Sequence, residues 1–511
     1  MKKKKGLYAI AAAALLMGLI AGCGGGKQNE GEQASPNPDK GGTVTKKTFT
    51  MLTDSHPSYP YSKDWPVWKL LEDKTGATFN VQTPSGKLED TINLTIASGE
   101  MPDLMFMYGK TQANKFGQQG ALVNILDYKE DMPNFKKWME KYPDITKAQI
   151  AADGKMYMFP NEGFGEANRM IWMYREDVFK KHDLKAPTTF DELYTVLKKL
   201  KELYPKSYPF SFRIGNNLLL LKALSAQFQT NEGFYQVGGD VKYGPTEPNY
   251  KTMLEYLNKF YKEGLIPPDW LTVDAKKWQD MMSAEQSFVT IDYIGRIDFF
   301  NNALRKDRPD FNLAFMVPPV GKQGGKPQNA YMHVVDSGLT VSSKSKKIKD
   351  IMRTVDFMYS EEGRTISSWG KEGDTYIVEN GSKKIKPDFK DATDFRKQTG
   401  LATNGTYTWI DYDAYLSMAS KELQNAYVEA RKFDAPYRSL PDFNQKDLET
   451  VSTTGAAVDK YRDENVIKFI IGEQSLDNWS NYVSGLSNLG LPKLSELYKA
   501  AYDRTAKTSL K

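Results

Sequence analysis

The chain of 511 residues contains one cysteine, Cys23, and three histidines. A single thiol rules out disulfides within the chain and zinc sites that need several cysteines. A cysteine nucleophile is excluded as well if lipid modification consumes that thiol. The histidines His56, His182 and His333 stand far apart, and none belongs to an HExxH motif. The sequence therefore predicts no metal site and no cofactor.

Most of the chain has no excess of positive or negative charge. Residues 1–22 contain four lysines and no acidic side chain, so residues 23–511 carry 65 basic and 64 acidic groups. Proteins that bind nucleic acid concentrate basic residues on one surface. Because the remaining charges nearly balance, a nucleic-acid partner is not expected.

The sequence also lacks an apolar run long enough to cross a bilayer. The run from Leu7 to Ala21 has 15 residues, whereas a membrane-spanning helix needs about 20. It follows four lysines and precedes Gly22 and Cys23, which is the form of an export signal. The segment resembles the lipobox of bacterial lipoproteins, in which the cysteine thiol receives a diacylglycerol and the cysteine becomes the new N-terminus.

The lipobox resemblance implies a signal peptide over residues 1–22 and a lipid anchor, diacylglycerol and palmitate, at Cys23. The protein would then be held on the extracytoplasmic face of the cell membrane, and we expect a Gram-positive bacterium. An ordinary signal peptide with an unrelated cysteine, or an uncleaved anchor, is the alternative. Residues 24–42 contain one alanine as their only hydrophobic side chain. We therefore expect 23–42 to be a disordered tether with a reach of about 25 Å.

Beyond the tether, strand-like and helix-like segments alternate. This pattern is typical of βαβ units and of a largely parallel sheet. The expected strands are 49–52, 77–81 and 103–107, and the expected helices are 65–74 and 88–97. Ligands gather outside the carboxyl ends of the strands in such sheets. Tyr108, directly after the third strand, stands at that position.

A second α/β unit begins near Met170. Its expected strands are 170–174, 288–293 and 313–317, with a helix starting at 175 and a helical tail over 466–502. Thr189 and Glu192 form a capping box before a further helix that has one apolar face. The chain beyond Cys23 is too long for one hydrophobic core, so two lobes are expected.

Five segments carry recognisable motifs, namely 97–103 (ASGEMPD), 184–193 (LKAPTTFDEL), 263–267 (EGLIP), 369–376 (WGKEGDTY) and 472–491 (GEQSLDNWSNYVSGLSNLGL). Together they resemble the extracellular solute-binding protein family 1, the lipoprotein receptors of ABC importers. The similarity is greatest to a subgroup of large oligosaccharide-binding lipoproteins that includes alginate-binding members. Each motif is moderately specific, whereas their order and spacing behind a lipobox make the resemblance strong.

The resemblance implies an α/β fold of the periplasmic-binding-protein-like type II class, with two lobes joined by crossing strands and a ligand cleft between them. The crossings are expected near 170–175, 313–318 and 376–386. The first lobe would comprise 43–172 with about 319–375, and the second 173–318 with about 376–511. Binding proteins of this class close around their ligand by a hinge motion.

The implied function is a membrane-anchored receptor that captures a carbohydrate, an oligosaccharide in particular, and delivers it to ABC permease and ATPase subunits. We expect a monomer and no enzymatic activity. One alternative is a surface lipoprotein glycoside hydrolase, which needs two carboxylates, such as Asp292 or Asp411 with Glu372. No hydrolase motif accompanies them. The other alternative is the same receptor fold with a peptide or another anion as ligand.

One property of the subgroup is missing from this sequence. Many members carry an acidic, glycine-containing calcium loop after the helix that here ends near Tyr204. Residues 204–209 (YPKSYP) contain no carboxylate that could bind a hard cation. Calcium is therefore not expected.

Aromatic residues make up 12% of the chain, which fits sugar recognition by flat aromatic faces and fixed hydrogen-bonding groups. The candidate ligand-binding residues, taken from their positions in the family pattern, are Tyr108, Phe212, Arg213, Asn216, Asn217, Tyr293, Arg296, Trp369, Glu372, Tyr376, Trp65 and Trp409. Core packing is the alternative for each aromatic, and it is expected for Trp138, Trp278 and Trp479. The two arginines could instead form surface ion pairs, the two asparagines could cap a helix, and the 369–376 motif could serve a hinge.

Overall fold

The computed structural model describes residues 46–163, 169–213, 219–330, 335–403, 411–435 and 440–507. Cys23, the predicted signal peptide and the predicted tether lie outside these residues, as do Asn216, Asn217 and Trp409. Within the described part of the chain, no helix is long and apolar enough to cross a membrane. The chain from Val44 onward forms one compact unit. This unit contains two large groups of buried hydrophobic residues, which define the two lobes.

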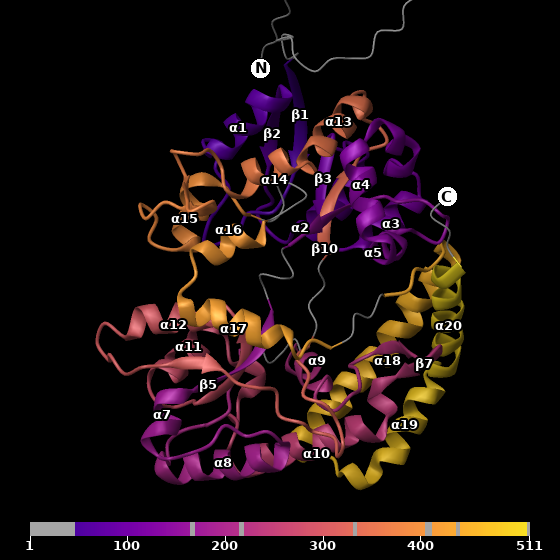
Figure 1. Ribbon diagram of the computed structural model, residues 1–511. Coiled ribbons are helices and arrows are strands. Elements are labelled where there is room, and N and C mark those ends of the chain that lie inside the picture. The colour runs from indigo at the N-terminus through magenta and orange to yellow at the C-terminus, as the bar shows by residue number, and fades with distance from the viewer. Residues whose placement is uncertain are drawn as a thin grey trace, which may run out of the picture. The chain divides into compact units, whose positions relative to one another are not determined.

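A five-stranded sheet with the order β2-β1-β3-β10-β4 forms the centre of the first lobe. β1 (Lys47–Leu52) pairs in parallel with β2 (Ala77–Gln82) and with β3 (Leu104–Met107), as the alternating sequence pattern predicts. β10 (Val335–Val341) runs antiparallel between β3 and β4 (Phe159–Glu162). A strand from much later in the chain therefore completes the sheet (Figure 1).

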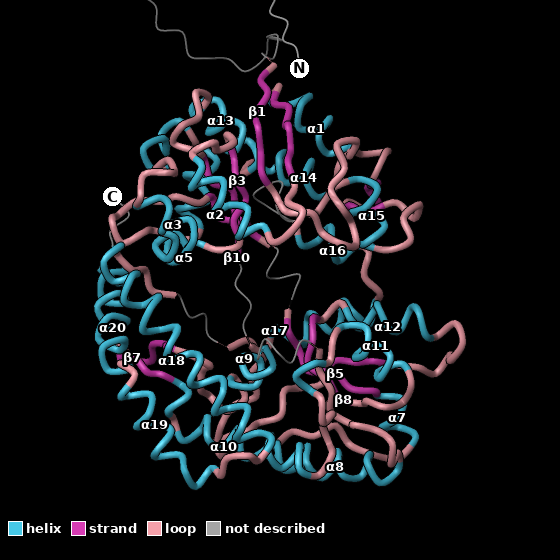
Figure 2. Tube along the Cα trace, turned by 180° about the vertical axis from the view of Figure 1, so that it is seen from behind, coloured by secondary structure: helices cyan, strands magenta, loops and turns pink. Residues whose placement is uncertain are grey.

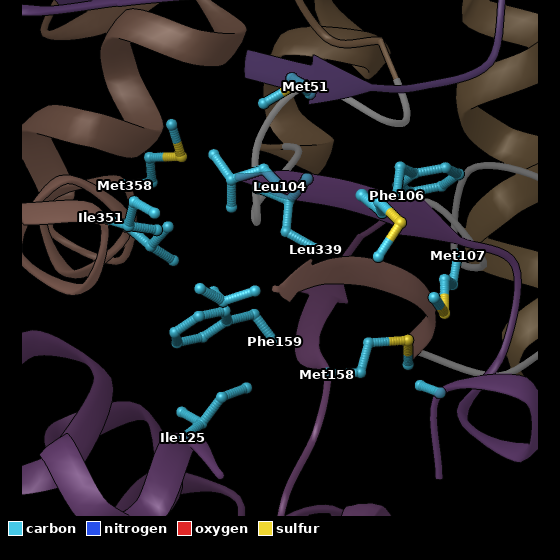
Figure 3. Packing of buried hydrophobic residues seen from close by; sticks show 14 of the residues in the cluster. Met51, Leu104, Phe106, Met107, Ile125, Met158, Phe159, Leu339, Ile351 and Met358 are labelled. Carbon is cyan, nitrogen blue, oxygen red and sulfur yellow. The ribbon is translucent and has the colours of Figure 1, made fainter. Parts of the chain in front are cut away.

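The core of the first lobe joins this sheet to the helices that cover it. Leu104 and Leu339 from neighbouring strands lie close to Ile351 and Met358 of α13 (Figure 3). All four side chains are at most 2% exposed, so the apolar surface that they bury stabilises the lobe. The helices of this lobe are α1 (Pro66–Thr75), α2 (Leu88–Ser98), α3 (Lys110–Gln118), η1 (Ile125–Asp131), α4 (Pro133–Lys141), α5 (Pro143–Gln149), α13 (Ile348–Met358), α14 (Glu361–Ser368) and α15 (Ala392–Thr399).

The second lobe contains a smaller, wholly antiparallel sheet with the order β8-β5-β9. β5 (Met170–Arg175) is its central strand, between β8 (Val289–Tyr293) and β9 (Leu313–Phe315). The hairpin β6 (Phe234–Val237) and β7 (Asp240–Tyr243) is separate from this sheet. The helices are α7 (Glu176–Lys181), α8 (Phe190–Leu203), α9 (Leu219–Ser225), η3 (Gly244–Thr246), α10 (Pro248–Lys262), η4 (Trp270–Thr272), α11 (Ala275–Ser283), α12 (Arg296–Leu304), α17 (Lys421–Arg431), α18 (Gln445–Ile471), η5 (Leu476–Asn478), α19 (Trp479–Asn488) and α20 (Leu491–Lys507).

Local sequence signals explain where several of these helices begin and end. The Thr189 hydroxyl accepts a hydrogen bond from the Glu192 amide at 3.2 Å, so the predicted cap of α8 is present. Its apolar stripe, Leu193, Leu197 and Leu200, is fully buried. The predicted helical tail is also present, where α18 packs along α10, α19 and α20 (Figure 2).

The predicted crossings between lobes differ from the structure in position. β5 and β9 pair with each other inside the second-lobe sheet, so the first crossing lies before Met170 and the return lies between β9 and β10. Residues 376–386 form the hairpin β11 (Tyr376–Glu379) and β12 (Ser382–Ile385).

After this hairpin the chain remains with the first lobe, because Phe395 and Leu401 are buried in its core. The last crossing lies at α16 (Tyr412–Ser417). Its Ala414 packs against Trp369 and Tyr376, whereas its Tyr412 and Leu416 pack with α17 against the second lobe. The boundary predicted near residue 376 therefore moves to about residue 418.

Candidate functional site

The first half of the candidate site lies where β1 and β3 end side by side. Leu52 is in register with Met105, so the segments that follow the two strands leave the sheet at the same edge. Tyr108 follows β3 and is 54% exposed. Its hydroxyl donates a hydrogen bond to the carboxylate of Asp54, which follows β1. An exposed aromatic face is thus held in place at the carboxyl edge of the sheet, as predicted for Tyr108.

A second aromatic group in the loop after β1 was not predicted from the sequence. The rings of His56 and Tyr59 stack at 3.9 Å between centroids with an interplanar angle of 8°. The Arg396 guanidinium lies 5.4 Å from the Tyr59 ring centroid. Desolvation of the imidazole lowers the pKa of His56, Arg396 lowers it further, and Asp54 opposes the shift. The imidazole is therefore neutral at pH 7.

The signal for this loop was present in the sequence SHPSYP, which directly follows the first expected strand. Proline and serine mark a turn, and of the two rings beside them His56 is exposed whereas Tyr59 is buried. Arg396 carries no comparable signal, because it reaches this place from α15, more than 300 residues later.

The second half of the candidate site is organised by Asp292 at the end of β8. This carboxylate is 1% exposed. Arg213 donates to it through Nε and, at 3.2 Å, through Nη2. Arg296 donates through Nε at 3.1 Å, and the Tyr293 amide donates at 2.7 Å. The structure therefore brings together Arg213, Tyr293 and Arg296, three of the predicted residues.

This Asp292 cluster carries a net positive charge because two guanidiniums share one carboxylate. The Arg213 guanidinium lies 5.2 Å from the Tyr293 ring centroid, which fits a cation–π contact. The Arg296 guanidinium lies 5.6 Å from the ring of Trp278, which is fully buried as predicted. Both arginines are ion-paired, as the alternative interpretation held, but their partner is a buried carboxylate at a strand end.

Four of the predicted aromatic residues lie in the core, which corrects their interpretation as ligand platforms. Trp65, Phe212, Trp369 and Tyr376 are between 3% and 7% exposed. The Trp65 indole donates to the Lys397 carbonyl at 2.9 Å. Phe212 packs edge-on against Trp270 at 6.0 Å. These side chains stabilise their lobes and present no free face to a ligand.

The 369–376 motif forms a compact turn. Gly370 has φ of 84°, and an added Cβ would lie 2.3 Å from Thr375 Oγ1. The Trp369 indole donates to Asp411 at 3.0 Å and packs edge-on against Tyr376. Glu372 is exposed on this turn. The glycine in this motif is therefore required by the backbone, which supports a structural role for the motif.

The described residues contain a cavity of about 830 Å³ beside Tyr108. Its walls come from α2, α3, α9 and the first turns of α18. Lys110 Nζ donates to the carbonyl of Leu440 at 2.9 Å, and both residues line the cavity. Elements from both lobes thus border this hollow.

No group of three or more histidine, cysteine or acidic side chains suited to a metal ion occurs among the described residues. At the place of the family's calcium loop, Lys201 Nζ donates to the Ser207 carbonyl at 2.6 Å. The carboxylate that a hydrolase would need at residue 292 already accepts hydrogen bonds from two arginines. The other candidate carboxylate, Asp411, accepts a hydrogen bond from the Trp369 indole.

Comparison with known proteins places these features in a family. The family model of the bacterial extracellular solute-binding protein matches residues 58–365. The fructooligosaccharide ABC transporter substrate-binding protein FusA of Streptococcus pneumoniae is 23% identical over 501 residues, which cover 90% of each chain. Lipoprotein LipO of Bacillus subtilis is 25% identical over 379 residues, covering 71% of this chain and 72% of LipO.

Among solved structures, the alginate-binding protein AlgQ2, determined without calcium ion, has a TM-score of 0.74 and 25% sequence identity. The match covers 90% of this chain and 99% of AlgQ2. It confirms the predicted type II periplasmic-binding-protein-like fold. Since the family model spans more than half of the sequence, the chain belongs to the bacterial extracellular solute-binding protein family.

Proposed function

We propose that the protein is the carbohydrate receptor of an ABC importer and that its ligand is an oligosaccharide. The observation that carries the proposal is that each lobe holds an aromatic ring beside fixed polar groups at the end of a strand. One offers the exposed ring of Tyr108 beside Asp54. The other offers Tyr293 with the guanidiniums of Arg213 and Arg296. Aromatic faces with fixed hydrogen-bonding groups suit a sugar ring, and FusA and AlgQ2 are named for carbohydrate ligands.

The proposal includes capture by lobe closure and transfer to the permease and ATPase subunits, with no covalent chemistry. The protein acts as a monomer and is attached to the outer face of the cell membrane through lipidated Cys23. The similarity to a lipoprotein, LipO, supports the anchor. An anchored receptor meets its transporter at a raised local concentration.

The test is a thermal-shift screen of the compact unit that begins at Val44. The panel contains fructooligosaccharides, alginate oligomers and short peptides. A ligand that binds only the native state raises the melting temperature, so we expect a rise with at least one oligosaccharide. A rise with peptides alone would contradict the proposal, and cleavage of the bound sugar on long incubation would indicate the hydrolase instead.

The anchor has its own experiment in the full chain. Wild-type protein is expected in the membrane fraction, and Cys23→Ser in the soluble or secreted fraction. Equal membrane association of both would contradict the lipid anchor.

A further inference from the structure

A second cavity lies in the second lobe, and none of the candidate ligand residues lines it. This side cavity has a volume of about 700 Å³. Its walls are α9, the β6–β7 hairpin, one face of α18 and the facing turns of α20. Four aromatic side chains line it: Phe234, Tyr243, Tyr498 and Tyr502. The rings of Phe234 and Tyr498 stack on each other with centroids 4.0 Å apart, so they form one well-packed part of the wall.

Tyr243 lies on the wall of the side cavity beside Arg462. The side chain is 6% exposed, and its hydroxyl oxygen is buried. Burial raises the pKa of Tyr243, although the charge of Arg462 and a hydrogen bond with it oppose the shift. The ring of Tyr243 therefore forms part of the cavity wall, and its hydroxyl is directed at Arg462.

The other polar groups of the side cavity offer both donors and acceptors. Arg462 donates to Asp459 and to Asp463 at 2.7 Å each, and to the Glu232 carbonyl at 3.3 Å. Burial raises the pKa of the Glu232 carboxyl, and Lys222 and Arg462 counteract part of this effect. Charges of both signs therefore surround the cavity, which suits a neutral polyhydroxylated group better than a simple ion.

The glycine in the middle of α18 keeps the side cavity open. Gly455 lines the cavity, and a Cβ added there would meet no atom within 4 Å. Packing therefore does not require glycine, although glycine destabilises a helix interior relative to alanine. Retaining the smallest residue at this place preserves the volume of the cavity.

The side cavity is continuous with the cavity that contains Tyr108. Lys222, Leu440 and Ser452 line both. A chain molecule bound at Tyr108 can thus extend along α18 into the second lobe. This continuity connects the side cavity with the proposed carbohydrate site.

We propose that the side cavity is a binding subsite for the terminal sugar unit of an oligosaccharide whose other units lie in the cavity beside Tyr108. The proposal rests on the proposed carbohydrate function. It assigns apolar contact to the aromatic rings that line the cavity and hydrogen bonding to Glu232 and Lys222. The receptor therefore binds longer oligosaccharides more tightly than short ones of the same type.

The test measures affinity by calorimetry for fructooligosaccharides and alginate oligomers of increasing length. Wild type is compared with Gly455→Leu, which fills the cavity, and with Gly455→Ala, which keeps most of its volume. Within the type of oligosaccharide that binds, we expect Gly455→Leu to bind the longer oligomers at least tenfold more weakly than wild type does. Its affinity for the shortest oligomer that binds should equal that of wild type. Gly455→Ala should match wild type at every length.

A second variant separates ligand binding from folding. Glu232→Gln keeps the size of a partly exposed side chain on the cavity wall and changes its hydrogen bonding, so it should keep the melting temperature of wild type and yet bind the longer oligomers severalfold more weakly. Equal affinities of wild type, Gly455→Leu and Glu232→Gln for all lengths would overturn the side-cavity proposal while leaving the carbohydrate function intact. Failure of every oligomer in both series to bind wild type would overturn both.

Discussion

Asp292 determines where two arginines and a tyrosine lie at the end of β8. Its carboxylate is buried, and its hydrogen bonds fix Arg213 and Arg296. Replacing Asp292 with alanine would leave two guanidiniums, which are 11% and 23% exposed, without a counter-charge. Breaking a buried ion pair in this way costs about 3 kcal/mol. We expect that loss in the free energy of unfolding by urea, together with weaker ligand binding.

The matched control is Asp280→Ala on α11. Its partner Lys276 is almost fully exposed, and exposed pairs contribute little. The urea midpoint of this variant should equal that of wild type. An equally small effect of Asp292→Ala would contradict the central role of the carboxylate.

Tyr108 tests binding without disturbing the core. More than half of the side chain is exposed, so Tyr108→Ala should leave the melting temperature of the free protein unchanged. If stacking on this ring contributes about 1.4 kcal/mol to binding, its loss lowers the affinity tenfold. The affinity is measured by calorimetry with the oligosaccharide that gives the largest thermal shift. Tyr108→Phe, which keeps the ring, should retain most of the affinity.

Asp442 predicts a pH dependence of stability. Burial raises the pKa of its carboxyl to about 6, although Lys110 and a hydrogen bond from Asn114 oppose the shift. The folded state then holds this proton more tightly than the unfolded state, whose carboxyl titrates near pH 4. The contribution of Asp442 to stability therefore falls as the pH rises from about 4 to about 6, by roughly 3 kcal/mol, and stays constant above that.

Asp442→Asn removes this titration. The free energy of unfolding of the variant, minus that of wild type, should rise between pH 4 and pH 6 and then level off. Urea titrations at several pH values measure the difference. A difference that does not change with pH would show that Asp442 titrates normally.

Sequence reasoning placed Tyr108 correctly at the end of a strand, where its exposure follows from its position. Tyr293 and Arg296 were expected from the family pattern, and they lie at the end and just beyond the end of β8. Ligand contact by these residues stays a prediction. The burial of Trp65 and Trp369 could not be predicted, because a tryptophan that stacks on a ligand and one that packs in a core look the same in the sequence. Arg396 was missed because only the folded chain brings α15 to the loop after β1.

At the scale of single elements, β10 depends on a glycine. A Cβ at Gly338 would lie 1.7 Å from the carbonyl oxygen of Phe159 in the neighbouring strand β4. Gly338→Ala should therefore push the two strands apart and cost about 3 kcal/mol of unfolding free energy. Gly86→Ala is the control, since no atom lies within 4 Å of its added Cβ. Chemical denaturation distinguishes them, and equal stability of both variants would contradict this account.

The helices and strands themselves were largely predictable because their signals are local. The expected strand 49–52 appears as Lys47–Leu52, and the helix expected at 88–97 as Leu88–Ser98. The place of β10 in the first sheet was not predictable in the same way. Its pairing with β3 and β4 joins residues more than 170 positions apart, and no local pattern encodes such a partner.

At the scale of the whole molecule, the two lobes were predictable from chain length, whereas the last crossing was not. Its position depends on Phe395 and Leu401, which bury themselves in the first-lobe core. The sequence around them is polar enough to suit either lobe. Hydrogen bonds from Asn114 and Gln118 of α3 to Asp442 and Phe443 then connect the start of α18 with the first lobe.

The two cores predict how ligand changes the unfolding of the whole molecule. Because the core around β3 and the core around β5 are separate clusters, we expect them to unfold separately without ligand, and calorimetry should show a broad or double transition. A ligand that contacts Tyr108 and Arg213 binds only when both lobes are folded. At a concentration 100 times its Kd it adds about 2.7 kcal/mol to the stability of that state. Both transitions should therefore rise and merge into one; a rise confined to one transition would show that the ligand occupies a single lobe.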